Sequence, residues 1–168
     1  KAEATHASGQ FGAAATLGDL WKAFETVDPQ KLWAAGARTG MPKRMMAWII
    51  SLYTNPRLLM YHGAVMQKAG WPRRGAPAGS RFADLCLRAV LIHPLDVFIQ
   101  RWPGANLTIY IDDFTLQQAG RIQDIKVNLA AMTCDLVRRL EDQSDSGPAL
   151  VVEQKKGQVV STHADVAA

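Results

Sequence analysis

The chain has 168 residues, of which 48% are hydrophobic and 20% are charged, and its formal net charge is +4. This length and composition indicate one globular domain with a single sizeable core, and the apolar runs fall short of the ~20 residues that cross a bilayer, so no membrane segment is expected. The modest basic excess is compatible with a polyanionic partner without identifying one, and the absence of a long basic run excludes a disordered basic tail.

In chain order, the apolar periodicity and the turn residues predict a strand, two helices, a hairpin, a helix, a hairpin, a helix and a last hairpin. These elements are expected over 13–20, 28–38, 42–54, 57–68, 80–94, 107–116, 122–140 and 150–160. Asp28 and Pro29 are typical of a helix start, because Asp caps and Pro suits the first helical position. Ser80 can cap the longer helix, and Pro94 should kink or end it.

This order predicts an α+β domain in which helices pack on one face of an antiparallel sheet. The domain is expected over 13–161, with no internal repeat and no interdomain linker. The small and polar residues 1–12 are expected to form a poorly ordered N-terminal segment, and residues 162–168 a C-terminal tail.

Two adjacent acids, Asp112 and Asp113, separate two apolar runs. A solvated hairpin turn is one interpretation, since Asp is common in two-residue turns. The other is a carboxylate pair that a rigid hairpin presents to a divalent cation, because like charges so close together are costly without a counter-ion. Mg²⁺ prefers carboxylate oxygens and keeps waters or phosphates as its other ligands.

A third acid, Asp19, ends the first apolar run. It can be a helix cap for the segment that follows it. Alternatively, one single and one double acidic site, each carried by a strand, are the donors that a two-metal phosphoryl-transfer centre needs.

Several segments resemble motifs of one enzyme family. The run DLWKAFETV, which starts at Asp19, resembles the first catalytic motif of reverse transcriptases, particularly those of non-LTR retrotransposons, and YIDDF at 110–114 resembles their YxDD motif. Further similar stretches lie at 51–57, 70–80 and 150–160. The likeness covers roughly 13–118 and 148–161, and the order and spacing of the motifs carry it more than any single motif does.

The resemblance implies that Asp19 and Asp112 are the principal catalytic ligands of Mg²⁺ or Mn²⁺ and that Asp113 supports the same metal site. It places Phe24 under the sugar of the incoming nucleotide, where bulk would exclude a 2′-hydroxyl; a core aromatic is the other interpretation. Lys156 matches the late lysine of the family, which is proposed to assist the pyrophosphate end of the nucleotide. A solvated turn residue explains Lys156 equally well.

The loop 70–79 departs from the family pattern. Reverse transcriptases usually have Gln before the glycine that corresponds to Gly75, whereas Arg74 stands here, and Arg73 is an additional residue. The resemblance assigns Arg74 and Gly75 to nucleotide binding, because this loop positions template and nucleotide. The two arginines contact phosphates in one interpretation and are solvated in the other. Ile111 is also bulkier than the usual alanine.

By resemblance, the chain is the palm domain of an RNA-directed DNA polymerase with fingers and thumb largely missing. Its expected partners are an RNA template, a DNA primer and deoxynucleoside triphosphates, with no membrane partner, and its expected location is intracellular, and nuclear if it belongs to an active retrotransposon. Two alternatives stay open. One is a catalytically inactive remnant with at most weak nucleic-acid binding, which Arg74 favours; the other is an RNA-dependent RNA polymerase, which Phe24 opposes because that enzyme must admit a 2′-hydroxyl.

Overall fold

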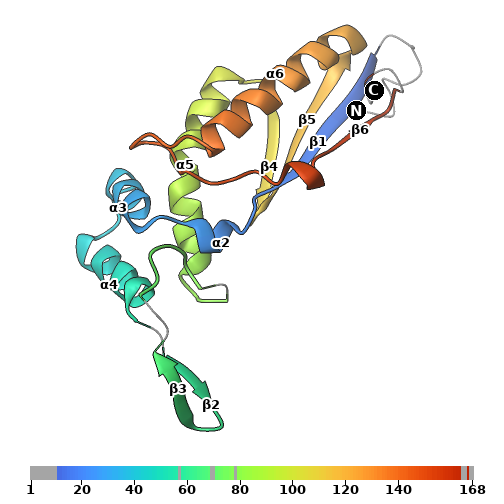
Figure 1. Cartoon of the computed structure of the whole chain (residues 1–168). Helices are drawn as coiled ribbons and strands as arrows, with labels where there is room; N and C mark the ends of the chain where they lie inside the picture. Colours follow the sequence, from blue (N-terminus) through green and yellow to red (C-terminus); the bar gives the residue numbers. More distant parts are fainter. Residues whose placement is uncertain (1–10, 57, 69–70, 78, 164–165, 167–168) are drawn as a thin grey trace.

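The computed structural model describes residues 11–56, 58–68, 71–77, 79–163 and 166. Its main feature is a four-stranded antiparallel sheet with the strand order β4-β5-β1-β6 (Figure 1). The strands are β1 (Phe11–Asp19), β4 (Asn106–Tyr110), β5 (Asp113–Arg121) and β6 (Gln158–Ser161). This sheet, together with the helices below, confirms the α+β class expected from the sequence.

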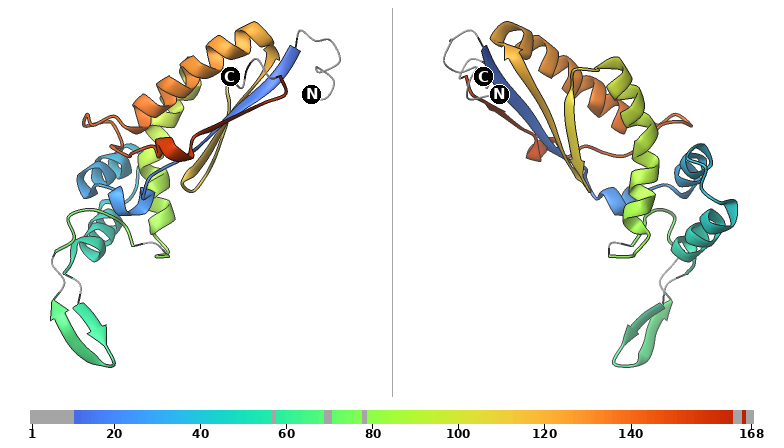
Figure 2. Two further views of the ribbon diagram at one scale, coloured as in Figure 1. Left: turned by 45° about the vertical axis from the view of Figure 1, so that its right-hand side comes forward. Right: turned by 180° about the vertical axis from the view of Figure 1, so that it is seen from behind.

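Two long helices accompany the sheet, α5 (Ala83–Arg101) and α6 (Ile122–Leu140). Helix α6 runs along one face of β1 and β5, and α5 packs against α6 (Figure 2). The predicted apolar face of α6 is the buried one, as its buried residues are Ile125, Leu129, Met132, Leu136 and Leu140. These side chains meet the fully buried Leu116 of β5 and Phe98 of α5 in one core. In the part of the chain that the structure describes, no helix covers the opposite face of the sheet.

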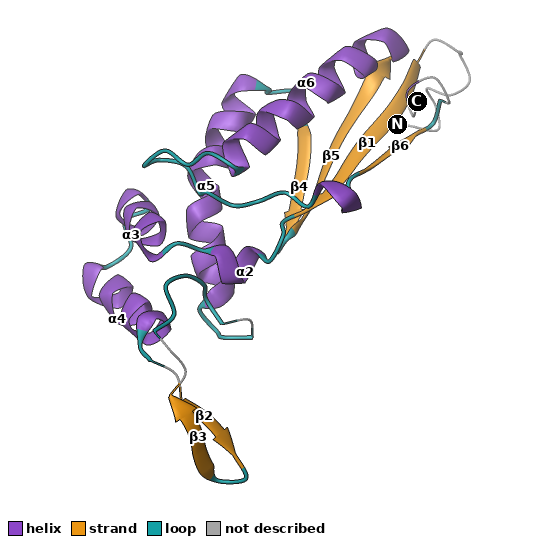
Figure 3. Ribbon diagram, in the orientation of Figure 1, coloured by secondary structure: helices purple, strands orange, loops and turns teal. Residues whose placement is uncertain are grey.

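A second group of elements lies beyond one end of the sheet, where its helices α2 (Ala23–Thr26) and α3 (Pro29–Arg38) contact α5 (Figure 3). It also comprises α4 (Lys43–Thr54) and a separate hairpin of β2 (Leu58–Tyr61) and β3 (Ala64–Lys68). Asp28 caps α3 as predicted, because its Oδ1 accepts a hydrogen bond of 2.8 Å from the backbone N–H of Gln30. The hairpin projects away from the helices, and positive φ angles at His62 and Gly63 fit its two-residue turn.

Glycine is required at position 18, near the end of the antiparallel pair of β1 and β5. Gly18 lies directly opposite Phe114, and the buried ring of Phe114 occupies the space above Gly18. A Cβ at Gly18 would lie 2.2 Å from Cζ of Phe114. The ring of Phe114 therefore packs directly on the backbone of Gly18, one residue away from Asp19 and Asp113 in the two strands.

Three predictions about helix boundaries and pairing were wrong. Helix α5 begins at Ala83, and its N-cap residue is Phe82 rather than Ser80. Ser80 Oγ lies 2.6 Å from the hydroxyl of Tyr53 and accepts only a long hydrogen bond of 3.4 Å from the backbone N–H of Phe82. It also continues through Pro94 to Arg101, so the proline does not end the helix, which was one of its two expected effects. Proline in a helix costs about 3 kcal/mol, but buried side chains on both sides of Pro94, including Val90, Leu91 and Phe98, hold the helix together.

The last hairpin expected from the sequence does not form. Val152 makes an isolated bridge with Leu20, the segment Gln154–Lys156 is a 3₁₀ turn (η1), and β6 pairs with β1. Both halves therefore join the free edge of the first strand rather than each other. Strand β1 begins at Phe11, so two residues of the expected poorly ordered segment belong to the sheet, while residues 1–10 lie outside the described residues.

No described helix is long and apolar enough to cross a membrane.

An ionic cluster on Asp135 of α6 ties this helix to α5. Its Oδ2 accepts hydrogen bonds of 3.0 Å from Trp102 Nε1 and Arg139 Nε, and Arg101 lies 3.5 Å from Oδ1. Burial raises the pKa of Asp135, but the hydrogen bonds from Arg139 and Trp102 and the two arginine charges outweigh it, so the pKa lies below its ordinary value. The charged carboxylate is thus the form that the fold stabilises.

This cluster predicts a specific acid sensitivity. A carboxyl group with a lowered folded-state pKa contributes stability above its unfolded-state pKa and loses it as the pH falls through the folded-state value. We therefore expect Asp135→Asn to lower the free energy of unfolding at pH 7 by about 1–3 kcal/mol and to flatten the loss of stability below about pH 4. Urea unfolding at pH 7 and pH 3 measures both. The exposed Asp96 of α5 supplies the control variant, Asp96→Asn; the same response in both variants would contradict the assignment.

Candidate active site

The turn between β4 and β5 presents Asp112 at the tip of a tight hairpin. Tyr110 pairs with Asp113, so Ile111 and Asp112 form a two-residue turn. Ile111 has a φ of 59°, which is rare for a β-branched residue. Such a backbone costs roughly 1–3 kcal/mol and persists only where the surrounding structure enforces it. The turn thus holds Asp112 in a fixed, strained setting, which is common at functional sites.

Asp19 lies beside this tip, as expected from the sequence. Asp19 is the direct partner of Asp113 in the β1–β5 pair, and the backbone N–H of Leu20 donates a hydrogen bond of 2.8 Å to the carbonyl of Asp112. Directly opposed residues of antiparallel strands place their side chains on the same face, with Cβ atoms about 4.5–5.5 Å apart. The structure therefore brings the three predicted acids to one end of the sheet, although they come from distant parts of the sequence.

Lys156 reaches the same place by a route that the sequence did not indicate. The backbone N–H of Glu153 donates to the carbonyl of Asp19 at 2.8 Å, and Val152 bridges Leu20. The 3₁₀ turn η1 that follows carries Lys156, whose ammonium donates to Asp19 Oδ2 and forms an ion pair with it. Sequence reasoning treated Lys156 as a family lysine or a solvated turn residue and missed this contact.

The ion pair with Asp19 shifts the pKa of Lys156. The hydrogen bond to Asp19 and the Asp19 charge raise the pKa of Lys156 above its ordinary value, and the more distant charges of Glu153 and Asp112 act in the same direction. The lysine side chain is 65% exposed, whereas that of Asp19 is only 12% exposed. A largely buried carboxylate is thus neutralised by a lysine that comes from the solvent side.

The donor chemistry of these acids fits a hard divalent cation. Mg²⁺ is commonly held by one or two carboxylates, with waters and substrate phosphates as its remaining ligands. Asp19 and Asp112 can supply two such carboxylates from neighbouring strands. Within the described ranges, no group of three or more His, Cys, Asp or Glu side chains is arranged to hold a metal ion by itself. The metal-binding roles of Asp19, Asp112 and Asp113 stay predictions.

The loop that contains Gly75 docks on the segment after Asp19. The backbone N–H of Gly75 donates to the carbonyl of Val27, and that of Ala76 donates to the carbonyl of Phe24, both at 2.8 Å. Gly75 has a φ of +96°, and a Cβ there would lie 2.8 Å from the carbonyl oxygen of Glu25. Glycine is therefore needed at this position for backbone contact. Phe24 is partly buried against the core, which leaves its predicted role at the sugar a prediction.

Arg74, the residue that departs from the family pattern, has a partner away from the acids. Its guanidinium lies 3.6 Å from Oδ2 of Asp28, whose other oxygen caps α3. The arginine side chain remains 55% exposed. The pair fastens the loop to the start of α3, and the predicted contact of Arg74 with a nucleotide is untested by it.

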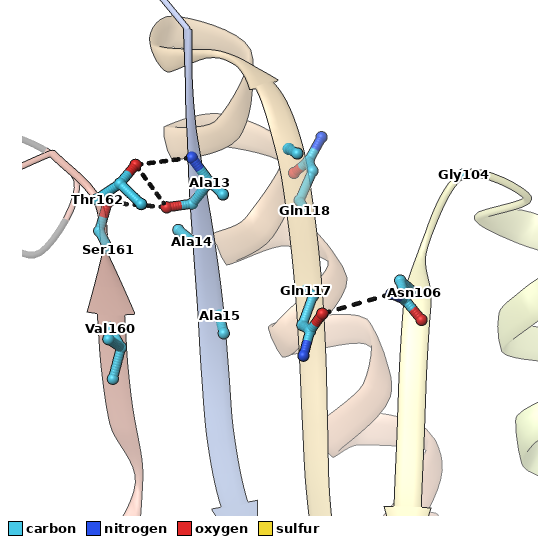
Figure 4. Close-up of a pocket in the computed structure, with 11 residues that line it drawn as sticks. Ala13, Ala14, Ala15, Gly104, Asn106, Gln117, Gln118, Val160, Ser161 and Thr162 are labelled. Carbon is cyan, nitrogen blue, oxygen red and sulfur yellow. Dashed lines mark hydrogen bonds between the residues drawn. The ribbon is translucent and has the colours of Figure 1, made fainter. Parts of the chain in front are cut away.

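The uncovered face of the sheet continues from the acids as a neutral surface. Ala15 and Gln117 share this face with Asp19, because they lie at alternate positions of β1 and β5. Around them is an open cavity of about 580 Å³, whose lining residues are all uncharged (Figure 4). In it, the side-chain amide of Asn106 donates to that of Gln117 at 3.4 Å. The acids therefore stand at one end of an uncharged floor.

No protein-family model and no curated protein matches the sequence. Two solved structures share the fold at 10% identity: apo telomerase from Candida tropicalis truncated from its C-terminal domain (TM-score 0.64) and telomerase from the same organism in complex with a TWJ fragment of telomeric RNA (TM-score 0.62). Each match covers 91% of this chain, but only 31% and 26% of the respective telomerase chain. The likeness shows that this chain shares the fold of part of the telomerase chain.

Proposed function

We propose that this chain is the palm part of an enzyme that extends a DNA primer on an RNA template. The observation that carries the proposal is the position of Asp112, in the turn between β4 and β5, beside the end of the strand that carries Asp19, where the backbone N–H of Leu20 donates a hydrogen bond to the carbonyl of Asp112. The polymerase-like fold and the order of the motifs support it. The resemblance to non-LTR enzymes favours RNA-directed DNA synthesis over other templated reactions.

Asp19 and Asp112 would hold Mg²⁺ or Mn²⁺, with Asp113 in support. When bound, the metal would supply charge stabilisation at the phosphates and activation of the primer hydroxyl. The strained turn at Ile111 and the hydrogen bond at Leu20 hold the two acids in place, which matters because phosphoryl transfer depends mainly on positioning and electrostatics.

The surroundings of the acids are suited to the other parts of the substrate. Phe24 would limit space at the sugar of a deoxynucleotide, and the backbone hydrogen bond from Ala76 fixes the Phe24 segment against the loop. Lys156 would bring a positive charge to the phosphates. The neutral sheet floor offers a surface on which a primer–template end can rest without displacing charged side chains. One of the two telomerase neighbours is bound to RNA, which supports an RNA partner.

Metal binding tests the first step of the proposal. We expect Asp112→Asn to weaken Mn²⁺ binding by about tenfold or more, because the amide keeps one neutral oxygen and loses the negative charge and the second donor oxygen of the carboxylate. Titration calorimetry or Mn²⁺-induced water relaxation measures the affinity. Asp145→Asn is the matched control, since Asp145 is exposed in the turn after α6. Equal Mn²⁺ affinity in the wild type and in Asp112→Asn would refute a metal site at this turn.

A non-catalytic remnant that binds nucleic acid is the second candidate. The departure of Arg74 from the family pattern favours it, and the partner that Arg74 has in the structure is Asp28 at the start of α3. The two candidates differ in one measurable respect: a remnant would bind a primer–template without any dependence on Mn²⁺ or on Asp112.

A further inference from the structure

Asp19 is the least exposed of the charged groups in the candidate site, and its charge needs a partner. Its side chain is 12% exposed, and a carboxylate that is largely removed from water is costly unless it is paired. The ammonium group of Lys156 contacts Oδ2 of Asp19 directly. The ion pair therefore occupies one of the two oxygens through which Asp19 could hold a metal ion.

Backbone hydrogen bonds hold the turn that carries Lys156 beside Asp19. The N–H of Glu153 donates to the carbonyl of Asp19, and the N–H of Lys156 donates to the carbonyl of Glu153 at 3.1 Å. The side chain beyond this anchored turn is 65% exposed. Lys156 can thus leave Asp19 by a change of rotamer into water, while its backbone stays in place.

Resting on the proposed function, we infer that Lys156 is a built-in counter-ion that competes with the divalent cation for Asp19. An ammonium group and a divalent cation repel each other, so each weakens the binding of the other to the same carboxylate. In the metal-free protein, Lys156 neutralises the charge of Asp19 and so reduces the repulsion among Asp19, Asp112 and Asp113. With a cation at Asp19, the exposed Lys156 side chain would turn into the solvent.

The test compares Mn²⁺ affinity, by electron paramagnetic resonance, in the wild type, Lys156→Gln and Lys155→Gln. Lys155 is the matched control, because it lies on the same 3₁₀ turn and its removal changes the net charge equally. We expect Lys156→Gln to bind Mn²⁺ about two- to fivefold more tightly, in keeping with the strength of a partly exposed ion pair. Lys155→Gln should bind as the wild type does. Lys156→Arg keeps the counter-ion and should bind no more tightly than the wild type.

The outcomes separate this inference from the proposed function. Tighter binding in Lys156→Gln alone supports the competition, as does binding that is detectable only in that variant. Equal affinity in all variants, with binding lost in Asp19→Asn, leaves the metal site standing and overturns the competition. No binding in any variant overturns both. If Lys156→Gln does not fold, Lys156→Arg with affinity above that of the wild type overturns the inference.

Discussion

Replacing Asp112 with asparagine is expected to remove nucleotide addition, the largest functional effect that this structure predicts. The assay is addition of deoxynucleotides to a DNA primer annealed to an RNA template, with Mg²⁺ and separately with Mn²⁺. A metal ion that the carboxylate holds would stabilise the charge on the transferring phosphoryl group by several kcal/mol, so loss of the carboxylate corresponds to about 10²–10³-fold in rate. Asp145→Asn, remote from the hairpin turn between β4 and β5, should retain the rate of the wild type.

We expect the 168-residue chain to add few nucleotides per binding event even with all acids intact. It spans less than a third of either telomerase neighbour, and Arg74 is paired with Asp28 where the related loop positions template and nucleotide. A misplacement of ~1 Å can cost ~100-fold in rate. Long products that persist in Asp112→Asn would contradict the assignment of this acid. Long products that the variant loses would confirm the acid but contradict the expected low processivity.

Alanine at Gly18 is expected to lower the stability of the protein. A Cβ would stand 2.2 Å from the ring of Phe114, and the buried ring has no free space into which to move. Overpacking of this kind costs about 1–3 kcal/mol of unfolding free energy. Because the clash adjoins Asp19 and Asp113, Mn²⁺ affinity should fall with stability.

Gly120 of β5 supplies the control for this prediction. A Cβ at Gly120 meets no atom within 4 Å, so Gly120→Ala should be neutral or stabilise by up to about 1 kcal/mol through the unfolded state. Thermal and urea unfolding of the two variants give the comparison. Equal free energies of unfolding for Gly18→Ala and Gly120→Ala would show that the packing of the Phe114 ring does not require a glycine at position 18.

Local sequence signals predicted the elements whose stability is local. Asp28 and Pro29 predicted the start of α3, because helix capping depends on neighbouring residues. The spacing of the apolar residues predicted the buried face of α6, because amphipathicity is a local pattern. The prediction that used Pro94 failed because it considered only the backbone hydrogen bond that a proline cannot make. The packing of α5 against the rest of the core, which the sequence does not reveal, outweighs the loss of that bond.

The candidate site divides in the same way. The turn at Asp112 and the strand end at Asp19 were predictable, since each is marked by acids that interrupt or end an apolar run. The contact of Lys156 with Asp19 was not, because it depends on the segment after α6 joining β1 instead of folding back on itself. The Arg74–Asp28 pair was hidden as well, since no local pattern links a loop arginine to a distant helix cap.

The sheet order has a consequence for how the protein folds. The strand that carries Asp19 is flanked by β5 and β6, and the ion-pair partners Asp19 and Lys156 lie 137 residues apart in the sequence. Closing such long loops is entropically costly, and contacts of this kind slow folding relative to local hairpins and helices. The β4–β5 hairpin can form locally, but its acids acquire their neighbours only when the first strand inserts between β5 and the last strand. The appearance of the site in a folding experiment should therefore coincide with completion of the sheet, well after the helices have formed.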